Sequence, residues 1–315
     1  MAVLNAQHLR PRLAAELAEA VPPAVQALGA QLAGRAGRGA VAVLYYGSTL
    51  RTGALDGLLD FYVLLDRASD WPGSRIAALG NRLLPPNVGY IEGHFDGVTL
   101  RAKYALITLR QFEQRVAGAT LDTTLWARFC QPCRRIWQRS HADGERVTAA
   151  IGNAVVTAAG WAAALGPDAA TPEDFWRALF AQTYVTELRV ESEDRSRDIV
   201  SAEAERYRAL LTPAWQAGGL EFEQQANGLL RPELSAPERA RRLQRWARLQ
   251  RWGKRLNILR LLKAAFTFDG AMDYVAWKIE RHRGVRIEVA PWQRRFPLLA
   301  APGLYWKLRR RGILR

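Results

Sequence analysis

The stretch "VLYYGSTLRTGALDGLLDFYVLL", Val43 to Leu65, contains two short apolar runs joined by a polar link. The first run ends in Gly47-Ser48, and the second run opens with Asp60. Apolar runs of this length, rich in aromatic and aliphatic residues and bounded by glycines, are typical of buried β-strands. The sequence therefore predicts a strand, a turn, a short helical link and a second strand, with the turn and Asp60 at facing ends.

A glycine–serine turn beside a carboxylate suits the binding of a metal–nucleotide complex. Gly47 lets the backbone approach a phosphate closely, and Ser48 adds a hydroxyl and an N–H donor. Asp60 would hold Mg²⁺, which usually binds through one or two carboxylates together with substrate phosphates. The alternative is an ordinary β-turn followed by a solvated aspartate. The two flanking apolar runs favour the metal–nucleotide site over this alternative.

The remaining pattern divides the 315-residue chain into parts of different character. Alternating runs in 88–104 flank Asp96-Gly97, a pair typical of hairpin turns, so the first part is expected to mix helices and strands. Residues 109–230 have mainly helical periodicity, and Thr171-Pro172 has the composition of a helix start. The pattern predicts an α+β protein with a mixed sheet in its first part.

Charge and composition narrow the class of partner. The formal net charge of +15 indicates a polyanionic partner, and both nucleic acid and an anionic lipid surface qualify. The most apolar window, 149–166, is mostly alanine, which favours a buried helix over a membrane span. We expect no signal peptide, because the N-terminus lacks a long apolar run. Cys130 and Cys133 form a lone C-x-x-C, which we interpret as ordinary reduced cysteines.

The segment after residue 236 has a basic amphipathic pattern. Residues 237–260 contain nine Arg or Lys against one Glu. Apolar residues recur there and just beyond at steps of three or four, namely Leu243, Trp246, Leu249, Trp252, Leu256, Leu259 and Leu262. A basic helix with tryptophan on its apolar face is typical of segments that lie on an anionic membrane surface. The alternative is a helix whose apolar stripe packs against the core.

The order of strand, Gly-Ser and strand-opening acid resembles the nucleotidyltransferase superfamily, which has the polymerase-β-like fold. Members usually carry a second acid two residues after the first, whereas Tyr62 stands there in this chain. One branch that also lacks the second acid is more similar: the mitochondrial-type phosphatidate cytidylyltransferases, or translocator-maintenance family of CDP-diacylglycerol synthases. Four further stretches resemble segments of that family in the same order, namely "LRAKYALIT", "LWARFCQPCRRI", "QTYVTELRVESEDRSRDIV" and "LKAAFTFDG".

The resemblance implies an architecture and an activity. It implies a nucleotidyltransferase domain over residues 1–125, a helical, winged-helix-like domain over 126–230, and a basic amphipathic, membrane-associating region over 231–315. The implied reaction converts CTP and phosphatidic acid into CDP-diacylglycerol and pyrophosphate, with Mg²⁺ as cofactor. The implied location is cytoplasmic and peripheral, on the inner face of a membrane, with the anionic membrane surface rather than nucleic acid as the polyanionic partner.

The resemblance also implies roles for individual residues of the strand-containing part. Gly47 and Ser48 would cradle the triphosphate, and Asp60 would be catalytic and bind Mg²⁺. Lys103 would be a second catalytic residue in contact with a phosphate, although a lysine at a solvated strand edge is the alternative. Arg51 would reach a phosphate, or it would simply be solvated.

Four residues complete the expected site. Asp56 and Glu92 are the candidates for further metal ligands, Glu92 because its strand is expected beside that of Asp60. A solvated loop acid and an outward-facing strand glutamate are the respective alternatives. Tyr184 and Arg189, from the helical part, would add to the nucleotide-binding cleft, with structural ion pairs as the default for an arginine there.

Two other functions stay open. The chain could transfer nucleotides to RNA or to a small molecule, which the high positive charge permits and the missing second acid disfavours. It could also be a catalytically degenerate module that binds a membrane or nucleic acid, and Tyr62 in place of an acid is the feature that supports this alternative.

Overall fold

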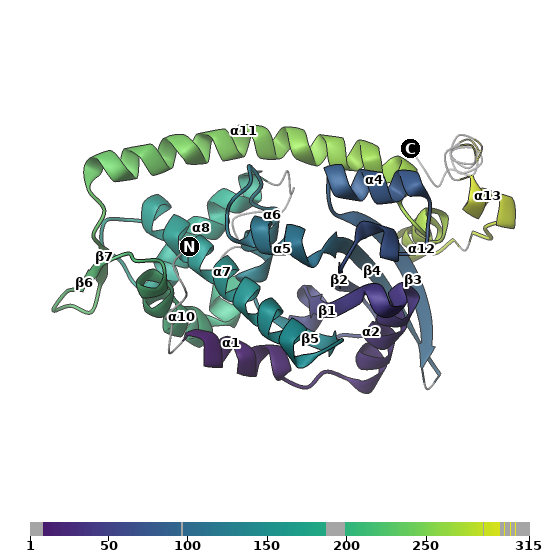
Figure 1. Ribbon diagram of the computed structural model, residues 1–315, viewed down its shortest axis with the longest axis horizontal. Coiled ribbons are helices and arrows are strands. Elements are labelled where there is room, and N and C mark those ends of the chain that lie inside the picture. Colours follow the sequence, from purple (N-terminus) through teal and green to yellow (C-terminus); the bar gives the residue numbers. More distant parts are fainter. Residues whose placement is uncertain are drawn as a thin grey trace. The chain divides into compact units, whose positions relative to one another are not determined.

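A computed structural model describes residues 9–95, 97–186, 199–285 and 287–296, together with 299, 303 and 306 (Figure 1). The described chain is of the α+β class, with a mixed sheet and a majority of helical residues. Contacts divide it into two compact units. The first unit comprises Met1–Val21 and Thr108–Leu259, and the second comprises Pro22–Ile107 and Arg260–Arg315.

This division differs from the three consecutive segments expected at 1–125, 126–230 and 231–315. The first helix packs against helices of the 108–259 stretch, and a segment near residue 269 pairs with a strand of the second unit. Each unit is therefore assembled from two separated pieces of sequence. Such long-range packing has no local sequence signal, so consecutive boundaries were the natural expectation.

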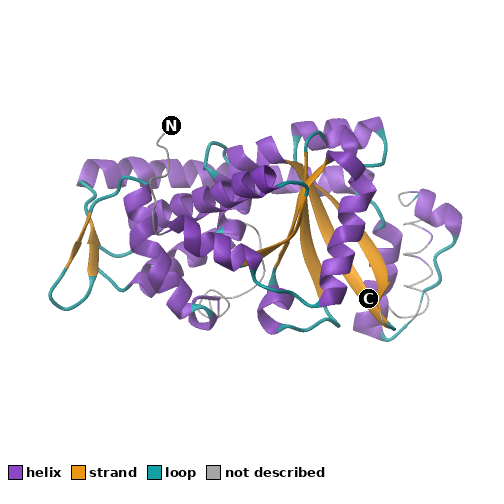
Figure 2. Ribbon diagram, turned by 60° about the horizontal axis from the view of Figure 1, so that its bottom comes forward, coloured by secondary structure: helices purple, strands orange, loops and turns teal. Residues whose placement is uncertain are grey.

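The second unit contains four strands in the sheet order β3-β4-β2-β1. Figure 2 draws the strands of the structure in orange. They are β1 (Ala40–Tyr46), β2 (Leu58–Leu65), β3 (Asn87–Phe95) and β4 (Val98–Thr108). Strands β1 and β2 pair antiparallel, and so do β3 and β4. Phe95 pairs with Val98 across the hairpin, and Gly97 has φ +78°, which confirms the predicted tight turn. Asp96 lies outside the described residues.

The second unit also contains helical elements, and a short extended segment at Asp269 pairs with strand β3 of this sheet. The helical elements are α2 (Pro23–Ala36), η1 (Gly37–Gly39), α3 (Ser48–Thr52), η2 (Ala68–Asp70), α4 (Arg75–Leu83), α12 (Ala271–Arg283) and α13 (Pro291–Arg295). Leu28 of α2 lies against Gly93 of β3, where an added Cβ would come within 3.0 Å of it. Tyr90 of β3 stacks with Trp277 of α12, with ring centroids 6.2 Å apart. The core of the unit contains the buried residues of β1, β2 and β4 together with those of α2.

Asp269 fastens the end of the chain to the sheet of the second unit. Its carbonyl accepts a 2.8 Å hydrogen bond from the Tyr90 N–H, so the segment adds a bridge beside β3. Its carboxylate accepts from the Tyr104 hydroxyl at 2.5 Å and from Arg35 at 2.9 Å. Burial and the neighbouring carboxylate raise the pKa of Tyr104, which therefore stays protonated and donates.

The first unit is mainly helical and is organised around α7 (His141–Leu165), which contacts α1, α5, α6, α8 and α10. Its other elements are α1 (Leu9–Ala18), α5 (Leu109–Val116), α6 (Thr124–Phe129), β5 (Cys133–Gln138), α8 (Pro172–Thr186), α10 (Ala204–Ala217), β6 (Phe222–Gln224), β7 (Leu230–Pro232) and most of α11 (Ala236–Thr267). Among the described helices, only α7 is long and apolar enough to cross a membrane, and most of it is buried in the protein. That burial agrees with the expected core helix.

Candidate functional site

Gly47 and Asp60 lie side by side where β1 ends and β2 begins. Tyr46 pairs with Asp60 in the antiparallel register, so the residue after Tyr46 sits next to the carboxylate. Gly47 has φ +99°, a conformation that side chains with a Cβ rarely adopt. A Cβ added to Gly47 would lie 2.9 Å from Asp60 Oδ2. Both the backbone conformation and the space beside the carboxylate therefore require glycine here.

The turn after Gly47 is a single short helix closed by a second glycine. Ser48 opens α3 and is exposed, whereas Arg51 is half-buried in its last turn. Thr52 Oγ1 donates a 3.1 Å hydrogen bond to the Ser48 carbonyl. Gly53 ends the helix with φ +71°, and its N–H bonds to the Thr49 carbonyl at 2.9 Å. The exposed Ser48 hydroxyl is thus held one residue away from the Gly47–Asp60 contact.

The charge of Asp60 acts on the buried end of β1. Asp60 is half-buried and pairs with Tyr46 of β1. Tyr45, the residue before Tyr46, is almost fully buried. Burial raises the pKa of the Tyr45 phenol, and the negative charge of Asp60 acts in the same direction. The carboxylate therefore lies at the boundary between solvent and a low-dielectric interior, where its attraction for a cation is stronger than in bulk water.

Asp56 lies in the exposed link before β2, and α12 reaches this link. Arg281 Nη1 donates a 3.4 Å hydrogen bond to the Asp56 carbonyl oxygen. The same guanidinium lies over the Trp277 ring, 5.5 Å from its centroid. Arg281 thus brings a positive charge to the loop that leads into Asp60. The sequence alone does not predict this contact, because no local pattern connects α12 with a loop more than two hundred residues earlier.

Lys103 and Glu92 occupy different strands with different relations to Asp60. Lys103 is half-buried on β4, the strand next to β2. Glu92 is exposed on β3, and β4 lies between β3 and β2, so its strand is not the neighbour expected from the sequence. Glu92 instead accepts a 2.6 Å hydrogen bond from Tyr90 and forms an ion pair with Arg101 at 3.3 Å. This local network accounts for Glu92 without a metal.

The donors near Gly47 fit one manner of Mg²⁺ binding and not another. Among the described residues, no group of three or more His, Cys, Asp or Glu side chains could hold a metal ion. An all-protein cage therefore finds no support in that part of the chain. Mg²⁺ commonly binds through a single carboxylate plus substrate phosphates, and Asp60 beside a bare glycine backbone meets that requirement.

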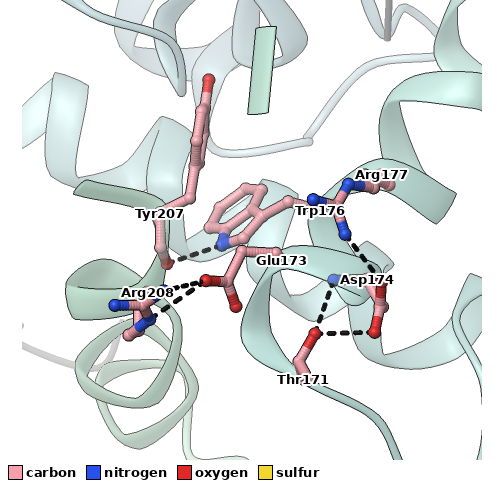
Figure 3. A network of polar contacts seen from close by, with 7 residues as sticks. All are labelled: Thr171, Glu173, Asp174, Trp176, Arg177, Tyr207 and Arg208. Atoms are coloured by element: carbon pink, nitrogen blue, oxygen red, sulfur yellow. Dashed lines mark hydrogen bonds and ion pairs between the residues drawn. The ribbon is translucent and has the colours of Figure 1, made fainter. Parts of the chain in front are cut away.

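The helical part contributes structural networks where it is described. Tyr184 lies on α8, but its side chain is outside the described residues, as is all of Arg189. Figure 3 shows the start of α8: Thr171 accepts a hydrogen bond from the Asp174 N–H at 3.3 Å, which confirms the predicted cap. In the same view Glu173 pairs with Arg208 at 2.6 Å, and Trp176 Nε1 donates to the Tyr207 carbonyl at 3.0 Å. These contacts join α8 to α10.

The lone C-x-x-C is part of the core of the first unit. Cys130 and Cys133 are both buried and free. Burial raises the pKa of the Cys133 thiol to about 12, so it is protonated and unreactive at neutral pH. This finding agrees with ordinary reduced cysteines.

The apolar stripe of α11 has two different environments. Trp246 and Leu249 are buried, and Trp246 packs against Trp161 with ring centroids 5.1 Å apart. The alternative of a core-packed stripe is therefore correct for this stretch. Other large apolar side chains of α11 are exposed, namely Leu243, Trp252, Ile258, Leu259, Leu261, Leu262 and Phe266. These side chains lie on a helix rich in arginine, as a surface-associating helix requires.

Comparison with known proteins adds no relative to this picture. The sequence matches no family model and no curated protein.

Proposed function

We propose that the second unit has a polymerase-β-like nucleotidyltransferase fold and transfers the cytidylyl group of CTP to phosphatidic acid. The products would be CDP-diacylglycerol and pyrophosphate. The observation that carries this proposal is the contact between Gly47 and Asp60, where glycine is needed both for φ and for space. The resemblance of the surrounding stretches to phosphatidate cytidylyltransferases supplies the substrate class.

The residues of the second unit have distinct tasks in this proposal. The Gly47 backbone and the Ser48 hydroxyl contact the triphosphate, and Asp60 would hold Mg²⁺. When bound, Mg²⁺ offsets negative charge on the triphosphate. Arg51, Lys103 and Arg281 are cations whose charge favours the departing pyrophosphate.

The chemistry is a displacement at phosphorus. An oxygen of the lipid phosphate monoester attacks the α-phosphorus of CTP and forms a new O–P bond. The bond from the α-phosphorus to the bridging oxygen breaks, and pyrophosphate leaves with that electron pair. Little covalent work falls to the protein, because positioning and charge stabilisation dominate such transfers.

The membrane location follows from the substrate. Phosphatidic acid resides in a bilayer, and the exposed apolar side chains of α11 are interspersed with arginines that attract anionic lipid. We therefore propose a peripheral protein on the cytoplasmic face of a membrane. Vesicles that contain phosphatidate should bind the protein more tightly than vesicles of phosphatidylcholine alone.

The test is turnover of labelled CTP by the full chain with phosphatidate vesicles. The proposal expects release of pyrophosphate that needs both Mg²⁺ and phosphatidate. A parallel reaction offers a tRNA pool in place of the vesicles. Label transferred to RNA but not to lipid would replace this proposal by the RNA-directed alternative, and no transfer to either acceptor would refute both the lipid and the RNA reactions.

A further inference from the structure

A cavity of about 450 Å³ lies in the first unit, between α7, α10 and α11. Its size falls within the range of small-molecule sites in proteins. Its lining is made of small and aromatic residues together with Arg242 and Arg245, and no Asp or Glu belongs to it. Two other cavities of the described chain have carboxylates of several residues in their walls. The cavity in the first unit therefore has the charge that suits an anion.

Both arginines are held in place by backbone carbonyls. Arg242 Nη1 donates to the Gly160 carbonyl at 3.1 Å, and Arg245 Nη2 donates to the Gly118 carbonyl at 3.0 Å. Arg245 also lies over the Trp161 ring, 5.9 Å from its centroid. In the part of the chain that the structure describes, neither guanidinium forms an ion pair within 4.0 Å, and Glu238, four residues before Arg242, interacts with it electrostatically. Each keeps further N–H donors, because a guanidinium carries five.

Arg242 and Arg245 are placed to bind one ligand together, by their separation along α11 and by the room beside them. Residues three apart on a helix lie on the same face, so Arg242 and Arg245 of α11 present their charges together. Gly160 lines the cavity beside Arg242, since a Cβ added there would lie 3.8 Å from Arg242 Nη1, at ordinary van der Waals distance. Guanidinium groups bind phosphate with paired, parallel hydrogen bonds.

We propose that this cavity binds the phosphate group of a phosphate monoester. The dianionic phosphate would lie between Arg242 and Arg245, and the adjoining carbon skeleton would contact Trp161 and Leu220. Two sources share this chemistry, a soluble sugar or glycerol phosphate and the headgroup of phosphatidate. The site is distinct from Gly47 and Asp60, and it stands whether or not the second unit transfers nucleotides.

The experiment measures binding of glycerol 3-phosphate to the full-length protein by titration calorimetry. A second arm measures cosedimentation with phosphatidylcholine vesicles, with and without phosphatidate. Three variants are compared with the unaltered chain. Arg242→Gln with Arg245→Gln removes both charges, Gly160→Leu fills the cavity and keeps them, and Arg248→Gln removes an exposed arginine of the same helix as a control.

The proposal expects saturable binding of at least one probe. It expects affinity to fall at least about tenfold in the double variant and in Gly160→Leu, and to change less than about twofold in Arg248→Gln. Binding of glycerol 3-phosphate identifies the soluble source, and binding of phosphatidate vesicles alone identifies the lipid source. Circular dichroism and thermal midpoints establish that each variant is folded.

Two results would overturn the proposal. One is equal weakening by Arg248→Gln and by the double variant, which would mean that only overall charge matters. The other is the absence of saturable binding to either probe. Affinity for CTP is measured separately. A protein that does not bind CTP would contradict the nucleotidyltransferase proposal for the second unit, whereas the phosphate site of the first unit is judged only by the two phosphate probes.

Discussion

Carboxylates serve different ends in the two units. In the first unit, Glu16 accepts two hydrogen bonds from Arg206, at 2.6 and 3.1 Å; Arg206 is buried, and the Glu16 side chain is 11% exposed. In the second unit, Asp60 is half-buried beside the bare backbone of Gly47, at the ends of two strands. The Glu16 carboxylate thus lies inside the helical unit, whereas Asp60 is partly exposed at a strand end. The second arrangement is the one that suits binding of a ligand.

The largest expected effect on stability comes from breaking the buried pair. Glu16→Gln leaves the Arg206 charge buried, and Arg206 also donates to the Cys130 carbonyl at 2.9 Å. We expect a loss of about 3–5 kcal/mol in the free energy of unfolding. The measurement is chemical denaturation followed by circular dichroism. Glu19→Gln is the matched control, since Glu19 is exposed in its pair with Arg134 and should cost about 0–1 kcal/mol.

The glycine beside Asp60 provides the next comparison. Gly47→Ala should lower the free energy of unfolding by about 1–3 kcal/mol. The alanine would have to adopt an unfavourable positive φ, and its Cβ would lie too close to the Asp60 carboxylate. The substitution should also abolish CTP binding. Gly53→Ala has the same kind of positive φ with no atom within 4 Å of the added Cβ. If Gly53→Ala weakens CTP binding as strongly as Gly47→Ala, the Gly47–Asp60 contact has no special role.

Alkaline pH should destabilise the first unit through Cys133. The thiol has a pKa of about 12 when folded and an ordinary value of 9.0, so above pH 9 only the unfolded chain releases the proton. The contribution is intact below pH 9 and falls by about 1.4 kcal/mol per pH unit between 9 and 12. Denaturation of the unaltered chain and of Cys133→Ala at pH 8 and pH 10 checks this. If the free energy of unfolding fell equally between pH 8 and pH 10 in the two proteins, the assignment to Cys133 would be contradicted.

The smallest expected effect on stability lies on α11. Phe266 is 75% exposed, so Phe266→Ser should change the free energy of unfolding by less than about 0.5 kcal/mol. Binding to phosphatidate vesicles should nevertheless weaken, which flotation assays would measure. Leu121→Ser removes an exposed apolar side chain of the first unit and should leave vesicle binding unchanged. Equal binding by both variants would count against α11 as the membrane contact.

Local patterns predicted local structure in both units. Thr171 caps α8 in the first unit, and the β3–β4 hairpin of the second unit turns at Gly97, as the sequence patterns predict. The facing ends of β1 and β2 agree with the expected placement of Gly47 and Asp60, because an antiparallel pair joined by a short link brings those ends together. The roles of these residues stay predictions.

Contacts between distant parts of the sequence could not be predicted. β4 lies between β3 and β2 in the sheet. The periodicity of apolar residues predicts strands but not the order in which they pair. The tie from Asp269 to Tyr104 and Arg35, and that from Arg281 to Asp56, join residues far apart in the chain. The buried half of the α11 stripe likewise depends on a tertiary partner, Trp161.

The measurement that tests the central claim most directly is CTP turnover by Asp60→Asn beside Asp66→Asn. Asp60 lies near the start of β2, beside the end of β1 that Gly47 follows, and Asp66 follows the other end of β2. With phosphatidate vesicles and Mg²⁺, we expect Asp60→Asn to lower turnover about 10³-fold and Asp66→Asn to retain it. Full turnover by a folded Asp60→Asn protein would contradict a metal–nucleotide site at this strand end.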